Sequence, residues 1–196
     1  TPSLIVLGSR RGLATRSIAL AVSSVQILRA LGLWAQLESR AAPIRHIHVS
    51  ARGRWGVTRL CAGDYGIDAL GYVIESEALT DCLYRAVQEC PHIELLEDAV
   101  FATIEQGDAV EVGFCQQGEQ RRLRAKLALI ADGAKSQARA ALGIGYRQID
   151  YGQAAVIANV EVSRARSDTA YERFTSGGPL ALLPLEPIQI PMMKSS

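Results

Sequence analysis

The sequence lacks several patterns that would point to a particular chemistry. Its four cysteines, Cys61, Cys82, Cys90 and Cys115, include no CxxC pair and show no regular spacing. Such isolated thiols are typical of a reduced, cytoplasmic setting rather than of a disulfide-stabilised protein. GxSxG, P-loop and HExxH sequences are also absent. Hydrolase and nucleoside-triphosphatase functions therefore have no support in the residues.

An excess of charge of either sign is also lacking. The 196 residues contain 21 basic and 20 acidic side chains, and the net charge is +1. This balance predicts no nucleic-acid partner. Arg45, Arg52, Arg54 and Arg59 form a local basic cluster around an expected turn. Their alternation in a hairpin favours an ordinary solvated face.

A metal site is not expected either, although two histidines lie close together in the sequence. His46 and His48 would share one face of a strand. No third ligand follows at a suitable spacing, since His92 lies far away after Pro91, and catalytic zinc typically needs three protein ligands.

Long uninterrupted hydrophobic runs are missing as well. Residues 1–16 have no signal-peptide pattern, and residues 17–37 are apolar but interrupted by polar and charged side chains. Because the apolar positions of this region fall on one helical stripe, they predict a core-packed helix over 16–31 rather than a membrane span. Gly32 would end that helix. Association with a membrane surface or with other enzymes stays open.

The most informative stretch is LALIADGAKSQARAALGIG, residues 127–145. Residues 127–130 are apolar enough for a buried strand, and Asp132 with Gly133 predicts a tight turn. Ser136 would cap the Ala-rich helix that follows. An ionised Asp at a strand end accepts hydrogen bonds from ligand hydroxyls, and a glycine lets a ligand approach the backbone. An ordinary strand-to-helix turn would have the same spacing.

The remaining chain predicts a mixed α/β pattern without repeats. A hairpin is expected from 44–50 and 55–60, and a helix over 77–90. Three strands with short glycine-containing turns predict an antiparallel meander. The expected meander strands are 99–104, 109–115 and 121–130, and further strands are expected at 154–162 and 180–185.

Several long segments resemble flavoprotein aromatic hydroxylases of the ubiquinone-biosynthesis branch. The acidic turn is similar to the "DG" motif of that family, and DYGQAAVIANV (150–160) and YERFTSGGPLALLP (171–184) are more specific still. The likeness also covers 15–34, 43–60 and 64–79, in family order. The family's GxGxxG loop is absent from this sequence, and its GDAAH-type motif is not found before the likeness ends near Leu185.

The resemblance implies the fold and its division into domains. It predicts an α/β (α+β mixed) fold in which a partial, Rossmann-like FAD-binding domain is interleaved with an antiparallel substrate-domain sheet. The FAD-binding part would comprise 1–42 and 61–149, and the substrate part 43–60 and 150–185. Residues 186–196 match nothing in the family.

The resemblance also implies a function. It predicts an FAD-dependent monooxygenase that uses NAD(P)H and O₂ to hydroxylate a polyprenyl phenol in ubiquinone biosynthesis. Arg16 would lie at the start of the helix that follows the dinucleotide motif, near the flavin and its pyrophosphate. Asp132 and Gly133 would bind cofactor hydroxyls, and no catalytic residue is assigned. The alternative is a truncated, non-catalytic module that binds an apolar ligand or a partner subunit.

Overall fold

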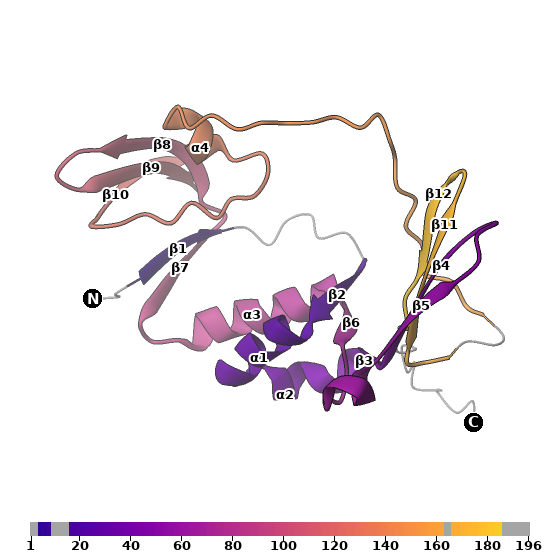
Figure 1. Cartoon of the computed structure of the whole chain (residues 1–196). Coiled ribbons are helices and arrows are strands. Elements are labelled where there is room, and N and C mark those ends of the chain that lie inside the picture. Colours follow the sequence, from indigo (N-terminus) through magenta and orange to yellow (C-terminus); the bar gives the residue numbers. More distant parts are fainter. Residues whose placement is uncertain (1–3, 9–15, 163–165, 186–196) are drawn as a thin grey trace, which may run out of the picture. The chain divides into compact units, whose positions relative to one another are not determined.

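The chain forms two compact units. The computed structural model describes residues 4–8, 16–162 and 166–185 (Figure 1). Of these, unit 1 comprises 4–8 and 87–156, and unit 2 comprises 16–86, 157–162 and 166–185. Helices and strands are mixed in both, which confirms the α/β class. The assignment of FAD-binding and substrate domains stays a prediction.

Unit 1 contains a parallel strand pair and an antiparallel meander. Strand β1 (Leu4–Gly8) pairs in parallel with β7 (Ile93–Glu97), with Leu4 opposite Ile93. The meander has the order β10–β9–β8, and its tight turns confirm the sequence prediction. Its strands are β8 (Val100–Gln106), β9 (Val110–Gln116) and β10 (Glu119–Ala125). The short helix α4 (Gln137–Ala141) follows later in the chain and contacts β8.

The strand expected at 127–130 does not form. Strand β10 ends at Ala125, and residues 127–130 have no partner strand among the described residues. Leu129 exposes 81% of its surface, so the segment is not buried. An apolar, β-prone run becomes a strand only when a neighbour satisfies its backbone N–H and C=O groups. Such a neighbour is missing from the described part of unit 1.

Unit 2 is built around a three-stranded sheet and its helices. The antiparallel order is β2–β6–β3, formed by Ser17–Ala21, Gly71–Glu75 and Ala41–Ile44. The helical elements are α1 (Val22–Ala30), α2 (Trp34–Leu37), the 3-10 turn η1 (Glu38–Arg40) and α3 (Ser76–Glu89), whose last residues belong to unit 1. Side chains from both helices and strands meet in one core. Its buried members are Val25, Leu28, Trp34, Leu37, Ala41, Ala69, Tyr72, Ile74, Ala78 and Cys82.

The helix predicted over 16–31 is only partly correct. Its first turn is instead strand β2, which pairs with β6 from Ser17 opposite Glu75 to Ala21 opposite Gly71. The helix begins at Val22, where the sheet pairing ends. Its end is as predicted, because Gly32 follows with a φ of 73° and its N–H donates to the carbonyl of Arg29. Residues 17–21 are apolar enough for a buried helix or a strand. They form a strand because they pair with β6.

A second, four-stranded sheet in unit 2 has the order β12–β11–β4–β5. Its strands are β4 (His46–Ala51), β5 (Val57–Cys61), β11 (Thr169–Thr175) and β12 (Gly178–Leu182), and the 3-10 turn η2 (Ala62–Tyr65) follows β5. The β4–β5 hairpin confirms the prediction. Strand β11 was not predicted, although it pairs in parallel with β4 and antiparallel with β12. Ala170 of β11 is buried together with Ile44 and Val73.

The strand expected at 154–162 is also wrong. These residues are exposed along their whole length and unpaired with any described strand. Their β-branched side chains match strand propensity, but propensity is decided by packing against neighbours, which the segment lacks. Among the described residues no helix has the length and apolar character needed to cross a bilayer.

Candidate functional site

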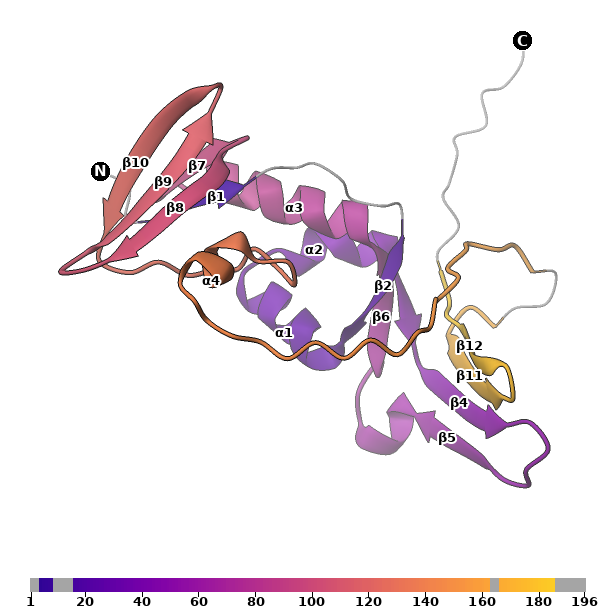
Figure 2. The same ribbon diagram turned by 90° about the horizontal axis from the view of Figure 1, so that it is seen from above.

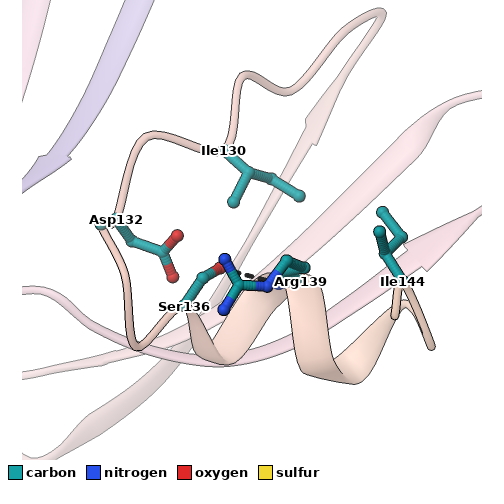
Figure 3. A pocket seen from close by; sticks show the side chains of 6 residues that line it. Ile130, Asp132, Ser136, Arg139 and Ile144 are labelled. Atoms are coloured by element: carbon teal, nitrogen blue, oxygen red, sulfur yellow. Dashed lines mark hydrogen bonds between the residues drawn. The ribbon is translucent and has the colours of Figure 1, made fainter. Parts of the chain in front are cut away.

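Residues 130–144, which contain the acidic turn and α4, form an open hollow in unit 1. It is lined by Ile130, Asp132, Gly133, Ser136, Arg139 and Ile144 (Figure 3). The turn prediction holds here, because Gly133 has a φ of 86° and α4 begins directly after Ser136. A Cβ on Gly133 would meet no atom within 4 Å, so the space above this glycine is open. A ligand could therefore reach the backbone at this point.

Asp132 is held by the residues that start α4. The Ala138 N–H donates to Oδ2 of Asp132 at 3.4 Å, and Figure 3 shows the carboxylate next to the Ser136 side chain. The hydrogen bond from Ser136, followed by those from backbone N–H groups, lowers the pKa of Asp132 below its ordinary value of 3.8. The carboxylate is exposed and ionised at neutral pH. It can accept further hydrogen bonds from hydroxyl donors.

Ser136 and Arg139 fix the shape of the turn. The Ser136 hydroxyl accepts the N–H of Arg139 at 2.9 Å, which confirms the predicted cap. The Arg139 guanidinium donates to the Ala134 carbonyl at 2.7 Å and lies 4.3 Å from the centre of the Tyr146 ring. Arg139 was not among the predicted site residues. Its place three residues after the cap was the available signal, since that spacing returns a side chain to the start of the helix.

Arg16 belongs to unit 2, whereas the residues that line the hollow belong to unit 1. It precedes strand β2 instead of a helix, so its expected position at a helix N-terminus is wrong. Its carbonyl accepts the N–H of Ser76 at 2.9 Å, where α3 begins. The side chain is exposed. Residues 9–15, directly before Arg16, lie outside the described ranges.

The two histidines on β4 are engaged by other side chains. Nε2 of His46 lies 3.8 Å from a carboxylate oxygen of Asp168, and the His48 ring lies 5.7 Å from that of Tyr171. The described part of the chain contains no group of three or more His, Cys, Asp or Glu side chains able to hold a metal ion.

The comparisons with known proteins decide the family. A family model described as "FAD binding domain" matches residues 9–194. The chain belongs to this FAD-binding family. The resemblance stated from the sequence is thereby confirmed, and FAD is the cofactor of the family.

The relatives include ubiquinone hydroxylases. The chain is 30% identical over 173 residues to the 3-demethoxyubiquinol 3-hydroxylase of Escherichia coli, covering 87% of this chain and 43% of that protein. It is 30% identical over 171 residues to the ubiquinone hydroxylase UbiL of Rhodospirillum rubrum, covering 87% of this chain and 39% of that protein. The chain thus spans less than half the length of these relatives.

A solved structure supports the fold. The chain is similar to Pseudomonas aeruginosa PqsL, solved with 2-aminobenzoylacetate, with a TM-score of 0.70 and 18% identity over 92% of this chain and 50% of that one. This likeness concerns the fold alone.

The residues of the acidic turn fit one part of FAD. The cofactor carries ribose and ribityl hydroxyls, which are hydrogen-bond donors, and Asp132 offers an exposed, ionised acceptor. The open space at Gly133 allows close approach. Helix α4 has only five residues, so no phosphate site is inferred at its start.

Proposed function

We propose that this chain is part of an FAD-dependent monooxygenase that hydroxylates a polyprenyl phenol in ubiquinone biosynthesis. The observation that carries the proposal is an open acidic turn, Asp132–Gly133, inside a chain matched over 9–194 by the FAD-binding family. The names of the ubiquinone hydroxylases among its relatives support the substrate class.

Each proposed residue has a limited role. Asp132 accepts hydrogen bonds from cofactor hydroxyls, and Gly133 lets the cofactor approach the backbone. The Ser136 hydroxyl donates a hydrogen bond that favours the ionised form of Asp132. Arg16 supplies a cation to the pyrophosphate, a role that suits a guanidinium because it can donate two parallel hydrogen bonds. When bound, FAD supplies the redox chemistry through which NAD(P)H and O₂ hydroxylate a phenol ring.

The apolar part of the substrate needs an apolar wall. Leu180 and Leu182 of β12 are exposed and alternate along the strand, so they lie on one face of the four-stranded sheet. We propose this pair as a contact for the prenyl chain. The alternative is that the two leucines only pack within the protein. If they contact the prenyl chain, Leu182→Ser should weaken binding of a prenyl phenol without loss of FAD.

The deciding experiment places this chain in the context of a longer relative. In a chimaera, the matched segment of the E. coli 3-demethoxyubiquinol 3-hydroxylase is replaced by this chain. Flavin absorbance measures cofactor retention, and mass spectrometry detects a product one oxygen atom heavier than an added prenyl phenol. Retention of flavin with NAD(P)H-dependent product formation supports the proposal. A folded chimaera that retains flavin and hydroxylates only unprenylated phenols contradicts the substrate class.

Asp132→Ala in the same chimaera tests the binding role. Loss of a charge-assisted hydrogen bond should weaken FAD retention roughly ten- to hundredfold. Asp108→Ala, in the β8–β9 turn, is the matched control and should leave retention unchanged. Equal affinity of the Asp132 variant and the parent would reduce Asp132 to a turn residue.

The chain by itself should bind FAD weakly or not at all and show no NAD(P)H-dependent hydroxylation. Its sequence lacks the GxGxxG loop that holds the pyrophosphate in this family, and each lost phosphate contact weakens binding about tenfold or more. Flavin fluorescence titration measures the affinity. A yellow protein with stoichiometric flavin would contradict this prediction, whereas a colourless, folded chain that binds a prenyl phenol would favour the non-catalytic module.

A further inference from the structure

Two hairpin tips lie next to each other at one end of the four-stranded sheet. Strands β4 and β5 are joined by residues 52–56, and β11 and β12 by residues 176–177 (Figures 1 and 2). The N–H of Arg52 donates to the carbonyl of Phe174 at 2.8 Å, and Phe174 lies opposite Ala51 in the parallel register. We call residues 51–57 and 173–180 the hairpin tip. All of it belongs to unit 2.

The hairpin tip exposes large apolar side chains. Trp55 is 103% exposed, whereas the other tryptophan, Trp34, is 4% exposed in the core. Val57, Phe174 and Leu180 each expose about half of their surface. A fully exposed tryptophan forfeits one of the largest hydrophobic contributions available to a side chain. Such a residue suits a boundary where one side is apolar and the other wet.

The hairpin tip is also cationic. Arg52, Arg54 and Arg173 are exposed, and Arg59 on β5 extends the charge along the sheet. Residues 46–63 contain no Asp or Glu. Glu172 precedes Arg173 on β11 and so points to the opposite face of the sheet. Within the described residues, none of these four guanidinium groups forms an ion pair with a carboxylate.

Apolar and cationic side chains also lie next to each other on one face of the four-stranded sheet. Val57, Ser50, Arg173 and Leu180 lie side by side across the four strands, at the end of the sheet that carries the hairpin tip, and they share one face. An apolar side chain thus stands at each edge of this row with a cation between them. Trp55 extends beyond the row at the end of the sheet.

We infer that the hairpin tip docks on the surface of an anionic lipid bilayer. Trp55 and Val57 enter the interface, and the arginines bind lipid phosphates and carboxylates. A nucleic-acid partner is less well matched, because the chain has a net charge of only +1 and the tip presents aliphatic side chains next to its cations. A second copy of the chain would bring like charges together at the tip. The inference is independent of the proposed FAD chemistry.

Vesicle flotation with the 196-residue chain tests the inference. Pure phosphatidylcholine vesicles are compared with vesicles that contain about 30 mol% phosphatidylserine, at low and high salt. We expect binding to the anionic vesicles only, reduced at high salt. The Trp55 emission should shift to the blue on binding, while the emission of buried Trp34 stays constant and reports an intact core.

Substitutions separate the two contributions. Arg52→Gln with Arg54→Gln should lower the vesicle partition coefficient about 25-fold, because each arginine near such a surface contributes about a fivefold effect. Trp55→Ser should weaken binding and abolish the blue shift, and Trp55→Phe should restore binding without the shift. Arg122→Gln with Arg124→Gln removes two exposed arginines from β10 and should leave binding unchanged.

Several results would overturn the inference. One is an absence of vesicle binding, and another is equal binding by the tip variants and the parent. A third is binding of a single-stranded oligonucleotide that the tip variants abolish while vesicle binding stays the same. A change of oligomeric state with Trp55→Ser in the absence of lipid would instead assign the tip to contact between copies.

Discussion

The four-stranded sheet of unit 2 and the segments 127–130 and 154–162 differ in a simple respect. All three contain runs of apolar side chains, and β-branched residues are frequent in the sheet and in 154–162. In the sheet, β4 lies between β11 and β5, and Ala170 of β11 is buried against the neighbouring sheet. In the two segments no described strand lies alongside, and Leu129 and Val156 are exposed. A strand-like sequence becomes a strand only where a partner completes its hydrogen bonds.

The missing partner strand at 127–130 also affects the candidate site. The acidic turn follows the unpaired run 127–130, so only the short helix α4 and its cap hold Asp132 in place. The sheet of unit 2 positions its side chains by register instead. Local hydrogen bonds determine the turn, and long-range pairing determines the sheet.

The largest expected effect is on the free energy of unfolding, when a substitution in a paired strand is compared with one in the unpaired run 127–130. Ile74 of β6 is fully buried, and Ile74→Ala should lower the free energy of unfolding by about 2–5 kcal/mol through lost packing and a cavity. Leu129→Ala should change it by less than about 0.5 kcal/mol, because the side chain is already in solvent. Urea unfolding followed by circular dichroism compares the two. A large cost for Leu129→Ala would show that the run is covered in solution.

Two glycines, Gly71 in a paired strand and Gly133 in the open turn, allow the same comparison at the backbone. A Cβ on Gly71 would lie 2.6 Å from the carbonyl oxygen of Leu20 on the neighbouring strand β2. Gly71→Ala should therefore separate β2 from β6 and cost about 1–3 kcal/mol. Gly133→Ala meets no atom and should cost about 1 kcal/mol, from its positive φ alone. Thermal unfolding measures both, and the reverse order would contradict the pairing described for β2.

The smallest effect concerns the capping serine. Ser136→Ala removes the hydroxyl that lowers the pKa of Asp132, so the Asp132 midpoint should rise toward 3.8. Loss of the cap should also cost about 1 kcal/mol. Carboxyl NMR titration measures the midpoint, and Ser176→Ala in the β11–β12 turn is the control. An unchanged midpoint would mean that backbone N–H groups alone hold the carboxylate.

The direction of the pH effect follows from the lowered pKa. Because the folded pKa of Asp132 lies below the unfolded value, its contribution to stability is complete above about pH 3.8. The contribution is lost as the pH falls through the folded pKa. Parent and Ser136→Ala should therefore differ in acid sensitivity only at and below that range.

Local signals in the sequence predicted the acidic turn, its cap and the glycine that ends α1 correctly. Ser136 bonds within its own turn, and Gly32 and Gly133 adopt conformations that glycine tolerates best. The meander and the β4–β5 hairpin were predicted because short turns bring neighbouring strands together. The position of Arg16 was predicted from the family resemblance alone. It was expected at the start of a helix, but it lies at the start of strand β2.

The sequence by itself determined the family, the acidic turn and the mixed α/β class, since these depend on motifs and on hydrogen bonds between residues close in the chain. Only the tertiary structure decided that Ser17–Ala21 is a strand, that β11 lies against β4, and that 127–130 and 154–162 stay unpaired. Each of these runs has the composition of a strand or a buried helix. Their state depends on whether a distant segment supplies the missing backbone partners, which no local pattern records.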